Sequence, residues 1–177
     1  MPLDPEDTSP EAAQELLEKC RKSALRLLDS RMHSRAELDR KLRQRDFPSV
    51  LRELILADLE RVGLVDDRMY AEAFVREKIA SSRPVGARRI LLDLRRRGIA
   101  DELAKEALAD AAEEGDGDAE LDRAKQAAER KWASLMRSKR EYQKARASLY
   151  RFLASRGFDS GTIRRVVDDL PRPPDAP

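Results

Sequence analysis

Apolar residues recur along this chain at helical spacing, and almost no segment shows the apolar–polar alternation of a strand. The first helix should begin at Ser9 and Pro10, because serine caps helix N-termini and proline is favoured at the first helical position. The pattern predicts an all-α protein. The apolar stripe of the first helix comprises Leu16, Leu17, Cys20, Ala24, Leu27 and Leu28.

Short polar motifs mark further helix boundaries. Ser34 and Glu37 have the spacing of a capping box, in which the serine accepts from a backbone N–H and the glutamate reaches back to another. Ser138 and Glu141 repeat that spacing. Helix ends are predicted at Gly63, Gly98 and Gly157 as left-handed C-caps, and at Pro84, after which Gly86 should open the next helix.

Three segments share one pattern of a helix, a turn and a second helix, namely residues 37–51, 89–103 and 148–163. With a preceding helix, each forms a three-helix unit that can bury its apolar stripe, so the chain reads as three tandem helix-turn-helix-like repeats. The third copy has one extra residue. The aligned positions are Leu38, Ile90 and Leu149; Leu42, Leu94 and Leu153; Arg45, Arg97 and Arg156; Asp46, Gly98 and Gly157; and Phe47, Ile99 and Phe158.

The predicted organisation follows from these boundaries. Repeats should span residues 11–62, 66–112 and 120–170. Residues 113–119 contain Gly115 and Gly117 among acids and should form a linker. Residues 1–10 and 171–177 are proline-rich, and we expect both tails to be disordered.

The repeated arginine and turn residue have an architectural interpretation. A cation in the last turn of a helix interacts favourably with the helix dipole, by about 0.3–1 kcal/mol. Asp46 stands where the other two copies have glycine, and aspartate tolerates the left-handed conformation. We therefore assign a structural role to Arg45, Asp46, Arg97, Gly98, Arg156 and Gly157.

Charge is abundant and segregated, although the formal net charge is only +2 with 40% charged residues. Residues 83–97 carry six arginines with Asp93 as their only acid, and residues 131–151 carry seven bases broken only by Glu141. Between them, residues 101–122 are acidic, with Lys105 as the only base. Such segregation creates strong local potentials and favours charged partners.

The helix predicted over residues 86–97 has an arginine face opposite its apolar face. An exposed Leu92 among arginines suits contact with protein or nucleic acid, and arginine suits bidentate contact with phosphate or carboxylate. An ordinary solvated face is the alternative. The candidate contact residues are Arg88, Arg89, Leu92, Arg95 and Arg96, with Arg40 and Arg43 in the first repeat and Lys144 and Arg151 in the third.

Residues for catalysis are scarce. His33 is the only histidine and Cys20 the only cysteine, which excludes the usual zinc sites, and no glycine-rich phosphate loop occurs. Asp66 and Asp67 are interpreted as helix-capping charges. We therefore expect a non-enzymatic protein without a cofactor or metal. Two aromatic residues, Trp132 and Tyr150, are expected to pack in the core or between repeats.

The cellular compartment is predicted from three features that the sequence lacks, namely a disulfide, a membrane span and a secretion signal. A lone cysteine cannot form an intrachain disulfide, no apolar run approaches the roughly 20 residues that span a bilayer, and the acidic start lacks the features of a secretion signal. These observations predict a cytoplasmic protein without a membrane partner.

The chain resembles the bacterial RecX family, the regulators of the RecA recombinase, over roughly residues 20–170. The resemblance implies three three-helix units in an elongated, curved molecule that has no catalytic residues. It also implies binding to the RecA–single-stranded-DNA filament, with inhibition of recombinase, ATPase and coprotease activity. The motifs that carry it are residues 31–38 (RMHSRAEL), 63–71 (GLVDDRMYA), 86–90 (GARRI), 97–99 (RGI) and 152–158 (FLASRGF).

Two other functions fit the same residues. A basic helix-turn-helix module would bind nucleic acid by itself, whether single- or double-stranded. A helical scaffold would bind another protein partner through Leu92 and its neighbours. We expect a monomer in each case.

Overall fold

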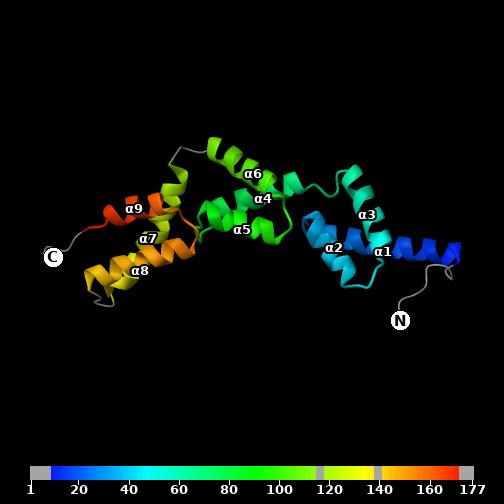
Figure 1. The fold of residues 1–177 in the computed structure, drawn as a ribbon, viewed down its shortest axis with the longest axis horizontal. Coiled ribbons are helices and arrows are strands. Elements are labelled where there is room, and N and C mark those ends of the chain that lie inside the picture. Colours follow the sequence, from blue (N-terminus) through cyan, green and yellow to red (C-terminus); the bar gives the residue numbers. More distant parts are fainter. Residues whose placement is uncertain (1–8, 115–117, 138–140, 172–177) are drawn as a thin grey trace. The chain divides into compact units, whose positions relative to one another are not determined.

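The computed structural model describes residues 9–114, 118–137 and 141–171, which form nine helices without a strand (Figure 1). The predicted all-α class with three three-helix repeats is confirmed, while an elongated, curved shape stays a prediction. The helices are α1 (Pro10–Ser30), α2 (Arg35–Arg43), α3 (Ser49–Arg61), α4 (Asp67–Ala80), α5 (Ala87–Arg96), α6 (Asp101–Glu113), α7 (Ala119–Arg137), α8 (Tyr142–Ser155) and α9 (Ser160–Asp168).

Some sequence expectations fall outside the described residues. They are the capping box at Ser138, the linker glycines Gly115 and Gly117, and residues 1–8 and 172–177 of the two tails.

Two compact units divide the chain. The first comprises Met1–Tyr70 and Arg97–Ile99, so it contains α1, α2, α3, the start of α4 and the turn after α5. The second comprises Ala71–Arg96 and Ala100–Pro177. Each unit therefore contains pieces of more than one repeat.

Helix starts follow the local rules that the sequence suggested. Ser9 accepts a hydrogen bond from the N–H of Ala12 at 3.3 Å, and Ser34 Oγ accepts one from the N–H of Glu37 at 3.1 Å. Asp66 caps α4 by accepting from two backbone N–H groups, those of residues 68 and 69, at 2.8 and 3.0 Å. These side chains satisfy N–H groups that have no partner within the helix.

Four residues after helix ends have positive φ angles, as left-handed caps require: Asp46 (61°), Gly63 (73°), Gly98 (81°) and Gly157 (84°). The prediction that Pro84 closes a helix is wrong in its detail, because α4 ends earlier, at Ala80. The backbone that follows Ala80 binds other helices instead. The carbonyl of Ser82 accepts a hydrogen bond from an arginine of α7, and the carbonyl of Pro84 accepts one from an arginine of the turn after α8.

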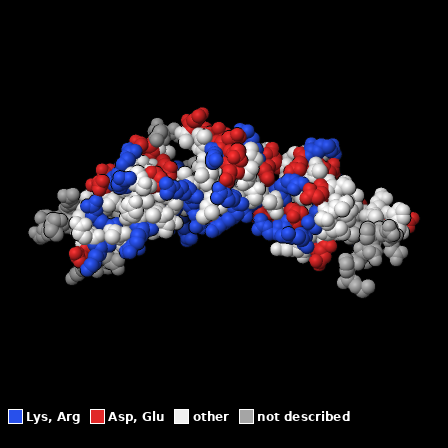
Figure 2. Space-filling view, viewed as in Figure 1, with Lys and Arg blue, Asp and Glu red and all other residues white. Residues whose placement is uncertain are grey.

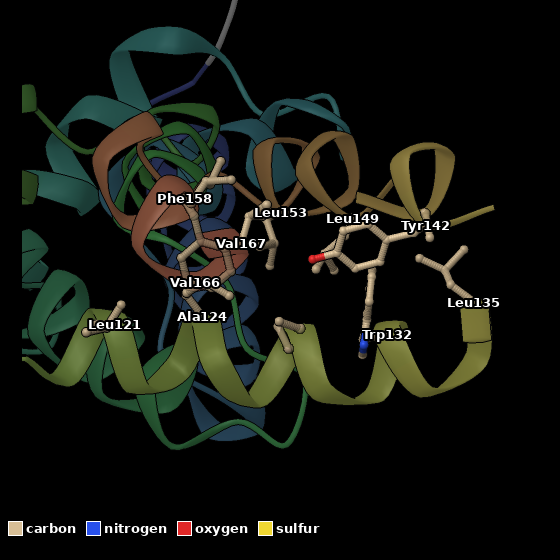
Figure 3. Packing of buried hydrophobic residues seen from close by; sticks show 14 residues of the cluster. Leu121, Ala124, Trp132, Leu135, Tyr142, Leu149, Leu153, Phe158, Val166 and Val167 are labelled. Atoms are coloured by element: carbon tan, nitrogen blue, oxygen red, sulfur yellow. The ribbon is translucent and has the colours of Figure 1, made fainter. Parts of the chain in front are cut away.

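The apolar stripes meet in separate cores. In the first unit, Leu38 and Leu42 are fully buried against α1 and α3. In the second, Leu149 and Leu153 are fully buried against α7 and α9 (Figure 3). Trp132 also lies in this core, where its ring meets the ring of Tyr142 edge-on, with centroids 5.8 Å apart.

The expectation of a packed Tyr150 is wrong, because its side chain is 37% exposed. Its neighbour Leu149 occupies the buried position. The next residue of a helix is rotated by about 100°, which turns Tyr150 away from the core.

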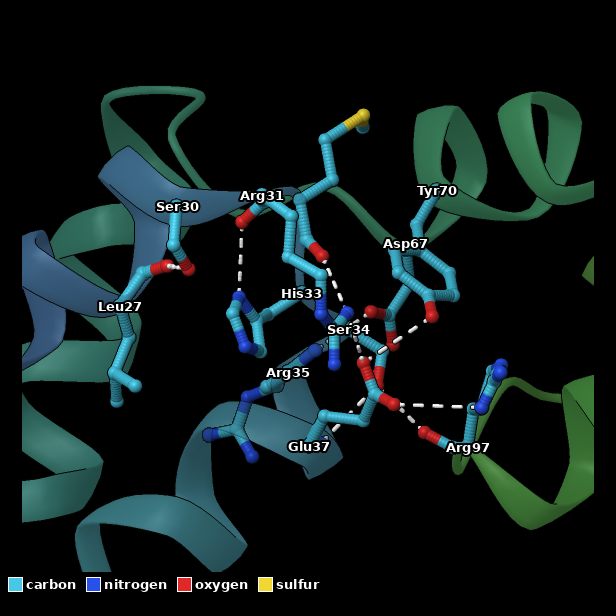
Figure 4. A network of polar contacts seen from close by, with 11 residues as sticks. Leu27, Ser30, Arg31, His33, Ser34, Arg35, Glu37, Asp67, Tyr70 and Arg97 are labelled. Carbon is cyan, nitrogen blue, oxygen red and sulfur yellow. Dashed lines mark hydrogen bonds and ion pairs between the residues drawn. The ribbon is translucent and has the colours of Figure 1, made fainter.

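The start of α2 is held by residues far along the chain (Figure 4). The backbone N–H of Arg35 donates to Asp67 Oδ1 at 2.8 Å, and the hydroxyl of Ser34 donates to the backbone carbonyl of Arg97 at 2.5 Å. Asp67 was expected to act only on its own helix. Its carboxylate instead accepts an N–H that α2 cannot satisfy itself.

Glu37 lies at the centre of this network. It was expected to reach back to the backbone, but its carboxylate accepts from Arg31 at 3.1 Å, from the hydroxyl of Tyr70 at 3.1 Å and from Arg97 at 3.5 Å. Burial would raise the pKa of Glu37, but the hydrogen bond and charge of Arg31, with those of its other partners, outweigh burial and lower it. The carboxylate is therefore stabilised as an anion.

Two neighbours of this network have pKa values shifted by burial. Burial raises the pKa of Asp67, against the opposing effect of the N–H of Arg35. Burial lowers the pKa of His33, whose Nδ1 lies 2.9 Å from the backbone oxygen of Arg31 and whose Nε2 has no partner among the described residues.

The start of α5 repeats this arrangement within the second unit. The N–H of Ala87 donates to Glu120 Oε1 at 3.0 Å, and the N–H of Gly86 donates to the carbonyl of Arg156 at 3.0 Å. Ala87 lies 52 residues after Arg35, which is also the offset between the aligned first and second repeats. The same junction therefore occurs twice, each time between the start of a second helix and the chain that follows.

Both junctions need a close approach of backbone. A Cβ atom on Gly98 would overlap with the Cβ of Ala36 in the first unit, and a Cβ on Gly86 would overlap with the backbone of Gly157 and Phe158 in the second. Gly86 has no positive φ, so its role is space and not conformation.

Replacing the buried carboxylate should weaken the first unit. We expect Glu37→Gln to lower the free energy of unfolding by about 2 kcal/mol, because hydrogen bonds to a charged group contribute about 1.5–3 kcal/mol. Urea unfolding followed by circular dichroism measures the difference. Glu53→Gln is the matched control, since Glu53 is exposed and pairs with Arg35, and it should change stability by less than about 0.5 kcal/mol.

The sign of the pH dependence gives a second readout of that variant. Because the pKa of Glu37 is lower in the folded protein, its contribution is present above the ordinary carboxylate pKa and is lost as pH falls through the folded value. The difference between the native protein and Glu37→Gln should therefore shrink on acidification. A difference that grows towards low pH would contradict the assignment.

Filling the space at Gly86 should destabilise the second unit. The added methyl group of Gly86→Ala meets backbone atoms that cannot move aside, and overpacking of this kind costs about 1–3 kcal/mol. Thermal unfolding measures the loss. Gly63→Ala is the comparison, because a Cβ there meets no atom within 4 Å and only the left-handed conformation opposes it. A Gly86→Ala protein as stable as the native one would contradict the close approach.

Candidate functional site

A cleft of about 480 Å³ lies in the second unit, beside α5 and the end of α8. The segment after α4 contributes Arg83 to its wall, α5 contributes Arg89 and Asp93, and the turn after α8 contributes Arg156. A smaller cleft of about 230 Å³ shares Arg83 and Arg156 with it and extends along α7. We call the two together the cationic cleft.

Cations dominate this cleft. Asp93 is its only acid, and it pairs with Arg89 at 3.1 Å. No described residue pairs with the guanidinium of Arg83, which is exposed. Its six cations are Lys78, Arg83, Arg89, Arg130, Lys131 and Arg156.

The repeat junction explains how the cleft forms. The guanidinium of Arg156 donates to the carbonyl of Pro84 at 3.3 Å, and Arg130 donates to the carbonyl of Ser82 at 2.7 Å. These bonds draw the segment before α5 against α7 and the turn after α8. The arginines are thereby held in place, while parts of their charge remain accessible to solvent.

The chemistry of this cleft suits an anionic chain. Arginine side chains present several N–H donors in a fixed plane that matches phosphate and carboxylate oxygens. A cationic groove along which a backbone can lie is typical of proteins that bind single-stranded nucleic acid. Figure 2 shows the same segregation, with Lys and Arg gathered over α5 and Asp and Glu over α6.

The predicted contact residues of α5 are placed as the helical wheel indicated. Ile90 and Leu94 are buried, while the side chain of Arg96 is 62% exposed and Leu92 is 39% exposed. Arg89 and Arg96 both pair with Asp93, at 3.1 and 3.6 Å. Arg89 alone of the predicted contact residues lines the cationic cleft, and the others lie on the surface outside it.

The remaining predicted residues are scattered. Arg88 is exposed and close enough to Asp159 to lower the pKa of that carboxyl, although hydrogen bonds from Thr162 are the larger cause. Arg95 pairs with Asp101 at 2.6 Å, so its charge is partly compensated. In the third repeat Lys144 pairs with Glu141 at 2.9 Å, whereas Arg151 of that repeat and Arg40 and Arg43 of the first are exposed without a described ion pair.

Sequence reasoning missed part of the cleft. Arg83 and Lys131 were counted in the basic stretches but not as site residues, Lys78 and Arg130 were not considered, and Arg156 was given only a structural role. The available signal was that Arg83 and Lys131 lie in two basic stretches, residues 83–97 and 131–151, which belong to neighbouring repeats. That signal becomes specific only when the segment before α5 is known to lie on α7.

Two searches of the described residues bear on other kinds of site. They contain no group of three or more His, Cys, Asp or Glu side chains arranged to hold a metal ion. None of the described helices is both long enough and apolar enough to cross a membrane.

The fold and the cleft define a class: a protein of tandem three-helix repeats whose second and third repeats present a cationic surface. Comparison with known families agrees repeat by repeat. Residues 20–59 match the first three-helix domain of RecX, residues 66–108 the second and residues 118–167 the third. The chain belongs to the RecX family of regulatory proteins.

Relatives with the name Regulatory protein RecX span most of the chain. The protein from Chlorobium phaeobacteroides (strain BS1) is 37% identical over 148 residues, which cover 83% of this chain and 90% of the relative. The protein from Chromohalobacter salexigens is 39% identical over 148 residues with the same coverage. A regulatory family points away from an enzyme, in line with the scarcity of catalytic residues.

Solved structures share the fold. The crystal structure of RecX from Lactobacillus salivarius has a TM-score of 0.75 and 25% sequence identity, and the match covers 89% of this chain and 97% of that chain. A second crystal structure of a regulatory protein RecX has a TM-score of 0.81 at 23% identity, covering 96% and 81%.

Proposed function

We propose that this protein binds the filament that RecA forms on single-stranded DNA and inhibits the recombinase, ATPase and coprotease activities of RecA. It would act in homologous recombination, DNA repair and the SOS response, in the cytoplasm, as a monomer without a cofactor or catalytic activity. Membership of the RecX family supports this proposal. The single structural observation that carries it is the cationic cleft, which offers six cations against one acid.

In this proposal, two surfaces of the second unit bind different parts of the filament, one the DNA and the other RecA. The larger part of the cationic cleft suits DNA phosphates, because the exposed Arg83 faces it and Arg156 is held beside it by the carbonyl of Pro84. The outer face of α5 suits protein, because it combines Arg88 and Arg96 with the exposed Leu92, and Arg89 lies at its border with the cleft. A molecule that lies in the helical groove of the filament and contacts successive RecA protomers would block the motions or exchange that filament growth requires.

Loss of the arginine face should weaken inhibition. Charge reversal at Arg88, Arg89 and Arg96 together should raise the concentration for half-inhibition of RecA ATPase activity by about tenfold, which corresponds to about 1.4 kcal/mol. The assay is RecA ATPase activity on single-stranded DNA, titrated with each variant. Lys105→Glu is the matched control, since Lys105 is exposed on the acidic helix α6 and should not contribute.

The outcomes separate the proposal from its alternatives. If the triple variant inhibits at the same concentration as the native protein, the α5 face does not contribute to inhibition. If the native protein does not inhibit RecA at all, the proposed function is refuted. DNA binding by the protein alone, measured over a range of salt concentrations, tests the helix-turn-helix alternative. DNA alone bound as tightly as the RecA filament would favour that alternative.

A further inference from the structure

A second cationic groove lies in the first unit, between α1 and the turn after α2. It has a volume of about 460 Å³ and is lined by Lys19, Lys22, Ser23, Arg26, Arg45 and Phe47. We call it the first-repeat groove. It contains four cations and no acid, and no described residue pairs with Lys22 or Arg26.

The smaller part of the cationic cleft is lined by a helix and a turn arginine of the third repeat in a similar way. On α1 the lining residues follow the spacing i, i+3, i+4 and i+7, namely residues 19, 22, 23 and 26. On α7 the lining residues 127, 130, 131 and 134 have that same spacing. Arg45 and Arg156, which are aligned in the repeat, complete the two sites. The two grooves therefore share a helical spacing and an aligned arginine, although Arg45 follows its first lining residue by 26 positions and Arg156 follows its own by 29.

The third-repeat copy holds a segment of polypeptide. The backbone carbonyl of Ser82 accepts from Arg130 at 2.7 Å, and that of Pro84 accepts from Arg156 at 3.3 Å. This segment lies between α4 and α5 and is not helical. In the third repeat, such a groove therefore holds non-helical backbone of the same chain through its carbonyl oxygens.

The first-repeat copy lacks such a segment among the described residues. Arg45 instead bonds to the backbone carbonyl and hydroxyl of Ser23 in its own repeat. Lys22 has the place in this spacing that Arg130 has on α7, and both Lys22 and Arg45 are solvent-exposed. The groove is accessible, and its cations can donate to backbone carbonyls as Arg130 and Arg156 do.

Differences between the two linings bear on the side chains of the ligand. At corresponding places of the spacing, Lys19 and Arg26 replace Ala127 and Ser134. Ser23 replaces Lys131. The segment bound in the third repeat contains Arg83 and no acid. The helix of the first-repeat groove thus carries one more cation than that of the third, and four cations without an acid in the whole groove complement acidic side chains on the ligand.

We propose that the first-repeat groove binds an extended, acidic peptide segment of a partner protein. Backbone carbonyls of the peptide accept from Lys22 and Arg45, and its carboxylates pair with Arg26 and with Lys19, which in the free protein pairs with Glu15 at 2.8 Å. Phe47 provides an apolar edge for one side chain. Nucleic acid is the rival ligand for four cations, but the bound backbone in the third repeat favours peptide.

The test uses peptides derived from the bound segment. The probe is ADSEPVGA, which is residues 80–87 with Ser81→Asp and Arg83→Glu, and the comparison is the unaltered ASSRPVGA. Each is titrated into the full-length ¹⁵N-labelled protein and followed by amide chemical shifts. The acidic peptide should shift amides of residues 19–26 and 45–47 and bind at least about tenfold more tightly than the unaltered one.

Two variants of the protein and a titration with single-stranded DNA serve as controls for peptide binding. Lys22→Glu combined with Arg26→Glu should abolish the shifts, and Lys105→Glu should leave them unchanged. Both lysines and Arg26 are exposed, so circular dichroism should show native folding in each variant. The proposal is overturned if millimolar acidic peptide shifts none of these amides, if both peptides bind equally, or if an octathymidylate shifts them at lower concentration than the acidic peptide.

Discussion

The backbone N–H groups at the start of the second helix in a repeat are the constraint on which much of this structure depends. A helix cannot satisfy its first N–H groups itself, and a buried donor without an acceptor is costly. In this protein the acceptors come from the chain that follows. Asp67 takes the N–H of Arg35, and Glu120 takes the N–H of Ala87. Repeats are thus joined by hydrogen bonds that involve backbone groups.

Other features of the chain follow from that arrangement. The turn after α5 and the turn after α8 bring their carbonyls to Ser34 and Gly86, respectively, and their glycines leave room for this approach. The arginines before the second and third turns can then reach partners in the preceding repeat, as Arg97 reaches Glu37 and Arg156 reaches Pro84. The same geometry that joins repeats also places arginines beside grooves. The turns that join the repeats therefore also position the arginines of the proposed binding surfaces.

Local sequence signals predicted much of the fold. The caps at Ser9 and Ser34 and the left-handed turn at Asp46 depend only on neighbouring residues, so their residue types were informative. The apolar spacing that placed Leu38 and Leu149 inward is equally local. Tyr150 was expected to pack because of its helical spacing, but the next residue towards the N-terminus, Leu149, takes the buried position and turns Tyr150 outward.

Contacts between distant residues could not be predicted in the same way. Glu37 fits a capping box, and nothing adjacent reveals that Tyr70 and Arg97 would draw its carboxylate away. Asp67 also looks like an ordinary first-turn acid, although it caps a different helix. The cationic cleft requires Arg83 and Arg130 to be near each other, and these lie 47 positions apart in the sequence. Pairings of this kind are set by how repeats dock, which periodicity does not specify.

Amide hydrogen exchange tests the central claim most directly. The N–H groups of Arg35 and Ala87 lie in the first turns of α2 and α5, where exchange is normally fast. Val50 lies in the first turn of α3, which has no side-chain cap, and serves as the reference. The account predicts protection at Arg35 and Ala87 that exceeds that of Val50 by about a hundredfold or more. Equal, fast exchange at all three positions would contradict it.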